Sequence, residues 1–276
     1  MTTLVPAHEA HVESRAADAA RRPAVVPRPI PLSRIVAVEL RKSFDTRSGF
    51  WLLASIAITA VLATGAVLLW APDSELTYDT FAAAIGFPMS VLLPVVAILS
   101  VTSEWSQRSG LTTFTLVPHR HRVVLGKAIV AVSIGVVSML VAMAIGAVGN
   151  IAGSAIAGVD TVWDDSLLHL AHIVLANTLG LLVGFMLGVL IRNSAGAIVA
   201  YFVYAFVLPT LSMLLANGQQ WFRDLQPWVD FNYAQTALFN GTLTGEQWAN
   251  LGVTSVIWLL VPLAVGVAMV LRSEVK

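Results

Sequence analysis

The chain of 276 residues is 57% hydrophobic and 12% charged, with a formal net charge of zero and a mean hydropathy of +0.79. Soluble domains carry about 25% charged residues, so this composition excludes an ordinary soluble protein and indicates one that crosses a membrane several times. Because there is no cysteine, disulfide bonds, thiolate metal sites and cysteine nucleophiles are excluded.

The N-terminal region divides into a polar tail and an amphipathic stretch. Residues 1–31 are rich in Ala, Arg and Pro and lack the apolar run of a signal peptide, so we predict a disordered cytoplasmic tail, inert rather than regulatory. Residues 32–48 read LSRIVAVELRKSFDTRS, with helical spacing of apolar residues and Glu39 interrupting the apolar face. This stretch is too short and too charged to span, so it predicts an interfacial connecting helix. The alternative is a cytoplasmic extension of the first spanning helix.

Six apolar segments of spanning length follow, at residues 50–70, 81–101, 123–151, 170–191, 195–216 and 251–271. Each holds the roughly 20 residues that a bilayer core requires, and backbone polar groups there are satisfied only within a helix. The predicted fold class is therefore an all-α polytopic membrane protein, with a six-helix transmembrane domain over residues 49–276.

Helix breakers and small residues are unevenly placed among these segments. Pro88 and Pro94 lie in the second span and Pro209 in the fifth, where each permits a kink; we take these three as candidates for lining a pathway. The fourth span carries a ridge of small residues at Gly180, Gly184 and Gly188. Such a ridge lets helices approach closely, either within one subunit or between two.

Basic residues gather on one side of the six-span layout. The chain holds sixteen Lys and Arg, and all except Arg223 fall before the first span, at the second or fourth connection, or after the sixth span. The intervening connections carry Asp and Glu instead. Connections rich in Lys and Arg stay in the cytoplasm, so both termini are predicted to be cytoplasmic.

The segment 217–250, predicted to lie outside, is long and aromatic, which is typical of short helices packed on or dipping into the outer leaflet. It could gate an exit or act as a structural cap. Nearby, His169 and His172 form an i, i+3 pair without a carboxylate motif, and an interfacial polar role is favoured over a metal site.

The sequence lacks the residues that several activities require. The central turns of the spans hold no Asp, Glu, Lys or Arg, which argues against an ion-coupled carrier. No G-x-S-x-G or H-E-x-x-H motif occurs. Gly126 and Lys127 are not preceded by the glycine of a phosphate-binding loop, so ATP-driven transport would need an ATPase on another chain.

Two stretches resemble a known family. The sequence ELRKSFDTRSGFW at 39–51 is similar to the start of ABC-2 type permeases, especially the bacterial antibiotic-export and self-resistance group. The sequence EWSQRSGLTTFTLVPHRHRVVLGK at 104–127 resembles their first cytoplasmic loop, and the similarity extends over about 32–276. The matching residues of this loop are Glu104, Gly110, Leu116, Pro118, Arg120, Arg122 and Lys127.

The resemblance implies an ABC-2 fold of the type V exporter kind, with a cytoplasmic coupling loop at 102–127 and a re-entrant segment within 217–250. It implies a dimer with an identical or different permease, ABC ATPase subunits that carry ATP and Mg²⁺, and the bacterial cytoplasmic membrane as location. Glu39, Arg41 and Lys42 are the site candidates on the interfacial helix. The expected ATPase-coupling residues are Ser103, Glu104, Trp105, Ser106, Gln107, Arg108, Ser109, Gly110 and Leu111.

These observations favour a permease subunit of an exporter of amphiphilic drugs, peptides or lipids, with import less favoured. No cofactor is expected in the chain itself, and no nucleic-acid partner. A second hypothesis is a membrane scaffold or signalling anchor that binds a cytoplasmic partner through the basic loop. A third, an intramembrane enzyme, is disfavoured because no nucleophile–base pair is present.

Overall fold

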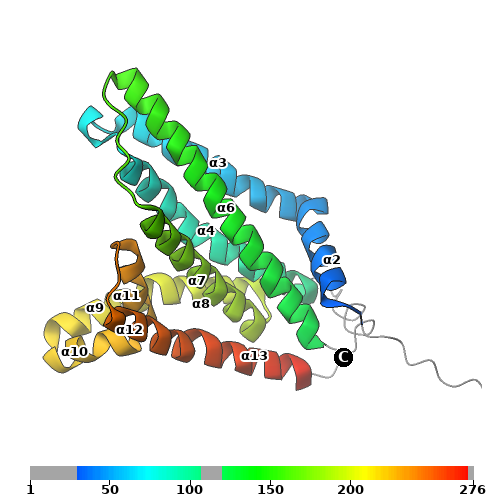
Figure 1. Cartoon of the computed structure of the whole chain (residues 1–276). Coiled ribbons are helices and arrows are strands. Elements are labelled where there is room, and N and C mark those ends of the chain that lie inside the picture. The colour runs from blue at the N-terminus through cyan, green and yellow to red at the C-terminus, as the bar shows by residue number, and fades with distance from the viewer. Residues whose placement is uncertain (1–29, 107–119, 273–276) are drawn as a thin grey trace, which may run out of the picture. The chain divides into compact units, whose positions relative to one another are not determined.

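Six helical segments in the described chain are long and apolar enough to cross a membrane, as predicted: Gly49–Trp70, Tyr78–Ser103, His121–Ala157, Leu167–Ile191, Ser194–Gly218 and Gly245–Arg272. The computed structural model describes residues 30–106 and 120–272 (Figure 1). Within these residues the β-type pairing is limited to one isolated bridge, between Thr77 and Val162. The predicted all-α polytopic fold class is confirmed.

The helices in chain order are α2 (Leu32–Asp45), α3 (Arg47–Trp70), η1 (Asp73–Glu75), α4 (Tyr78–Ser106), α6 (Arg120–Ala157), α7 (Leu167–Ile191), α8 (Ser194–Phe202), η2 (Val203–Val207), α9 (Leu208–Gly218), α10 (Gln220–Val229), α11 (Phe231–Thr236), η3 (Ala237–Phe239), α12 (Gly245–Ser255), η4 (Val256–Leu260) and α13 (Val261–Arg272). The described residues from Leu32 onward form one compact unit. The predicted tail falls almost wholly on residues 1–29, outside the described part.

The helical conformation is interrupted at Thr46, between α2 and α3. This residue is extended (φ −90°, ψ 139°), and its hydroxyl accepts a hydrogen bond from the Gly49 amide, which caps the first turn of α3. Because Thr46 interrupts the helix, α2 is a separate element and not a straight extension of the first span.

The fourth span, α7, is the most buried of the six, and it packs against α4, α6, α8 and α13. Its contact with α4 depends on Gly184, because a Cβ atom there would lie 2.5 Å from the backbone oxygen of Pro94. The glycine ridge predicted on this helix therefore serves close packing inside one subunit. Gly180, one turn earlier, has no such constraint: its nearest neighbour would be 3.8 Å away.

Gly184→Ala is therefore expected to lower the free energy of unfolding by about 1–3 kcal/mol, since the neighbouring atoms are backbone and cannot move aside. The matched control is Gly180→Ala, which is expected to be neutral or slightly stabilising because a helix favours Ala over Gly. Apparent melting temperatures of the two variants in the same detergent measure the difference. Equal effects would contradict the packing described here.

The fifth and sixth spans are each interrupted by a π-helical turn, η2 and η4. Pro209 and Pro262 each follow such a turn by two residues. Proline cannot donate a backbone hydrogen bond and its ring crowds the preceding turn, and a widened turn relieves this crowding without ending the helix.

The connections meet in two groups at opposite ends of the spans. At one end, which we call the acidic end, the Thr77–Val162 bridge joins two connections, and the Asp79 amide donates to Asp164. His169 and His172 of α7 bond at the same end to the backbone oxygens of Phe239 and Gly241. The two histidines thus fasten the aromatic segment, which forms short helices, to the fourth span. The other end, the basic end, carries α2, the last turns of α4 and the start of α6.

Candidate functional site

At the basic end, a buried ion pair joins two helices far apart in sequence. The Lys127 Nζ of α6 lies 2.6 Å from one carboxylate oxygen of Glu39 on α2, and both side chains are only 8% exposed. The other oxygen of Glu39 lies 2.7 Å from Lys42 Nζ, whose side chain is 47% exposed. A carboxylate with two charge-assisted hydrogen bonds is well satisfied at this depth. We call Glu39, Lys127 and Lys42 the junction.

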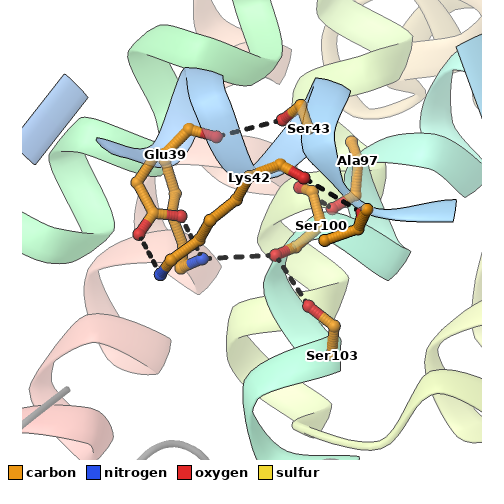
Figure 2. Close-up of polar contacts among 8 residues, drawn as sticks. Glu39, Lys42, Ser43, Ala97, Ser100 and Ser103 are labelled. Carbon is orange, nitrogen blue, oxygen red and sulfur yellow. Dashed lines mark hydrogen bonds and ion pairs between the residues drawn. The ribbon is translucent and has the colours of Figure 1, made fainter. Parts of the chain in front are cut away.

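The junction also reaches α4. Lys127 Nζ donates to the backbone oxygen of Ser100 at 3.4 Å. Figure 2 draws Glu39 and Lys42 of α2 together with Ser100 and Ser103 of α4. Three helices therefore meet at one lysine: α2, the end of the second span and the start of the third.

The helices α2 and α6 pack closely beside the junction. Gly126, next to Lys127, would place a Cβ atom 2.8 Å from Cγ2 of Ile35, a buried residue of α2. Any larger residue at this position would push the Ile35 side chain aside, so glycine lets α6 lie against α2 without such a shift. The Gly-Lys pair of the sequence, which is no phosphate-binding loop, thus has a structural explanation: glycine permits the approach and lysine bonds the helix that approaches.

The charge state of Glu39 follows from two opposing influences. Burial alone would raise the pKa of the Glu39 carboxyl, but the charges and hydrogen bonds of Lys127 and Lys42 together outweigh burial and lower that pKa below its ordinary value. Glu39 is therefore ionised throughout the physiological range, and the ion pair persists there.

This depressed pKa fixes how stability depends on pH. A carboxyl with a lower pKa in the folded state contributes stability that is fully present above its unfolded pKa, about 4.3, and is lost as pH falls through the folded pKa. The difference in melting temperature between the wild type and Glu39→Gln should therefore stay constant from about pH 5 to 8 and shrink only below about pH 4. A difference that shrinks as pH rises from 5 to 7 would mean that burial raises the folded-state pKa instead.

The last described turns of α4 are held on their other side. The Thr102 hydroxyl is 2.7 Å from that of Ser194, which begins α8, and it also donates to the Ile98 backbone oxygen. Ser194 follows the tight turn in which Arg192 ends α7 in the left-handed conformation (φ 57°). The end of α4 is thereby bonded to the start of the fifth span, next to the end of the fourth.

The predicted coupling residues are only partly described. Ser103 is half-buried on α4, and its hydroxyl donates to Ser100 at 3.3 Å (Figure 2). The backbone of Glu104, Trp105 and Ser106 completes the last turn of α4. The other five coupling candidates lie at positions 107–111, outside the described residues. On α2, Arg41 and Lys42 are exposed whereas Glu39 is buried.

The three pathway candidates have different surroundings. Pro94 is buried against Gly184 of α7, Pro88 is half-buried on α4, and Pro209 is half-buried in the first turn of α9. Pro94 is therefore a packing residue within the subunit.

Sequence reasoning found Glu39 and Lys127 separately but missed that they form a pair. The signal was present: a lone acidic residue on an otherwise apolar helix face, and a lone lysine inside the start of an apolar span. Each is costly unless it meets an opposite charge.

Comparison with known proteins identifies a family. Residues 35–208, more than half of the chain, match a family model described as ABC-2 family transporter protein. The matched range begins inside α2 and includes the junction. No curated protein matches the chain.

Proposed function

Since the chain belongs to the ABC-2 family of transporter proteins and is thereby a multi-pass permease component of an ABC transporter, we propose that it exports an amphiphilic substrate using ATP hydrolysed by separate ATPase subunits. ATP and Mg²⁺ would bind on those subunits. The proposal takes the basic end as the cytoplasmic one and the bacterial cytoplasmic membrane as the location.

The junction is the observation that carries this proposal. The segment between α4 and α6 would receive the movement of the ATPase, and the helices on both sides of it are bonded to α2 through Lys127. Because α4 and α6 are bonded to each other and to α2 through Lys127, a push that reaches them from this segment would tilt these helices together. Such rigid-body motion is a common form of two-state switching.

The substrate path would lie between two permease subunits, lined by the second and fifth spans. The fifth span is the least buried of the six. Its exposed residues Phe202 and Phe206 stack with ring centroids 5.8 Å apart. An identical or different second permease covering this face is part of the proposal.

The proposed orientation can be tested directly because the chain has no cysteine. In intact cells, a membrane-impermeant maleimide should label Thr242→Cys, in the segment proposed to lie outside, but not Ser109→Cys, in the proposed coupling loop. After the cells are permeabilised both should be labelled. The reverse pattern would contradict the orientation.

The function is tested by affinity purification of the tagged chain in mild detergent from its native host. We expect an ATPase to co-purify, ATP hydrolysis in the eluate, and loss of both when residues 104–127 are altered. A stable complex with another cytoplasmic protein and no ATPase, under conditions that preserve other transporters, would favour the scaffold instead.

A further inference from the structure

A cavity of about 400 Å³ opens at the acidic end, inside a single subunit. It lies between the first half of α4, the outer part of α7, the π-helical turn η2 and the short helix α11. Its volume is in the range of small-molecule sites in proteins. It is separate from the junction, which lies at the other end of the same spans.

Two residues that line the cavity carry a buried polar atom with no hydrogen-bond partner among the described residues. Asn177 is 2% exposed and lines the cavity, and its Oδ1 accepts no hydrogen bond from the described residues. The buried hydroxyl of Tyr204, in η2, is likewise without a partner among them. A buried polar atom left unsatisfied is costly, and a bound ligand would remove that cost.

The side-chain amides around the cavity share one pattern of hydrogen bonding. Three of them line the cavity, and the nitrogen of each donates to a backbone oxygen: Asn177 to Ile173, Asn232 to Tyr204, and Gln235 to Ala176. With the nitrogens held in this way, the group that each amide retains as an acceptor is its side-chain oxygen.

The charged residues near the cavity also favour a positively charged ligand. Asp79 lines the rim of the cavity, and Asp164 lies beside Asp79, because its carboxylate accepts the Asp79 amide at 2.9 Å. Among the described residues that line the cavity there is no Lys or Arg, and His169 is already bonded to Asp165. A group that enters finds negative charge at the rim and acceptors inside.

The remaining wall is apolar and aromatic. Phe87 of α4, 70% exposed, and Phe206 of η2 both line the cavity. Aromatic faces bind both apolar rings and organic cations.

We infer that this cavity binds an organic ammonium ion with an apolar, aromatic-sized body, its N–H groups directed to Asn177 and its charge toward Asp79. As the substrate class of the exporter, this inference rests on the proposed function. The binding itself does not, because it needs neither the ATPase nor transport.

The test uses the purified full chain in nanodiscs of zwitterionic lipid and three fluorescent probes that share one ring system. Dansylcadaverine carries a primary ammonium, dansylamide is neutral and dansylglycine is an anion. After subtraction of empty nanodiscs, we expect saturable binding of the amine, with affinity about tenfold or more above that of the neutral probe and no saturable binding of the anion. Equal binding of all three probes would mean an unspecific apolar pocket and would overturn the inference.

Variants locate the site. Asn177→Leu should weaken amine binding about tenfold or more, since it removes the buried acceptor. Asp79→Asn, at an exposed position that tolerates the change, should weaken it about twofold to fivefold, and this effect should vanish at high salt. Asp73→Asn, at an exposed position of η1 just before α4 and not lining the cavity, is the matched control. Amine binding that Asp79→Asn and Asn177→Leu both leave unchanged would overturn the inference while leaving the transporter assignment intact.

Discussion

Lys127→Met is expected to lower the free energy of unfolding by about 3 kcal/mol or more, the largest loss of stability from any single change at the basic end. The substitution keeps the length of the side chain but removes the charge that compensates a buried carboxylate. Among the described residues, the Glu39 carboxylate then keeps its bond to the exposed Lys42 alone. The apparent melting temperature in detergent measures the loss.

Lys42→Met is the matched control, because it removes a lysine from the same carboxylate. Lys42 is 47% exposed and Lys127 is 8% exposed, so water screens the first interaction and not the second. We expect a cost of at most about 1 kcal/mol for Lys42→Met. Equal losses in the two variants would contradict the role of burial at the junction.

A double-mutant cycle separates the ion pair from the packing around it. Glu39→Gln with Lys127→Met removes both charges, so the double variant should be more stable than the sum of the two single losses predicts. If the losses simply add, the two residues do not act as a pair.

Reversal of charge in the coupling loop is expected to have the largest effect on transport. In Glu104→Lys or Arg108→Glu, the substrate moved per ATP hydrolysed should fall about tenfold or more, in the range of coupling energies between distant sites. The membrane fold should assemble normally, because both residues lie at the proposed surface for the ATPase. Transport and hydrolysis are measured together in proteoliposomes.

Glu246→Lys makes the same kind of reversal at an exposed position of the acidic end, and it should leave coupling unchanged. Unchanged transport in both Glu104→Lys and Arg108→Glu would remove the coupling assignment from residues 103–111.

The spans were predictable because length and hydropathy alone determine them. The fourth was predicted at 170–191 and is observed at Leu167–Ile191. The third helix continues to Ala157, beyond the predicted end at residue 151, and Gly153 in this extension packs tightly against Leu68 of the first span. Hydropathy does not register such tertiary contacts, so the end was placed too early.

Contacts between distant residues could not be predicted in the same way. Glu39 and Lys127 are 88 positions apart, and their pairing depends on how α2 lies against α6. The π-helical turns near Pro209 and Pro262 were also missed: proline predicts a disturbed helix, but a kink and a widened turn satisfy the same constraint. The cavity at the acidic end likewise exists only through the packing of elements far apart in the sequence.

We propose that a separate ATPase acts on this permease through the segment between α4 and α6. The most direct test is a cross-link from Ser109→Cys, in an otherwise cysteine-free chain, to the proteins that co-purify with it. We expect a cross-link to an ATPase, with a yield that changes between the ATP-bound and nucleotide-free states. A reactive Ser109→Cys that cross-links to no ATPase, within a complex that contains one, would contradict it.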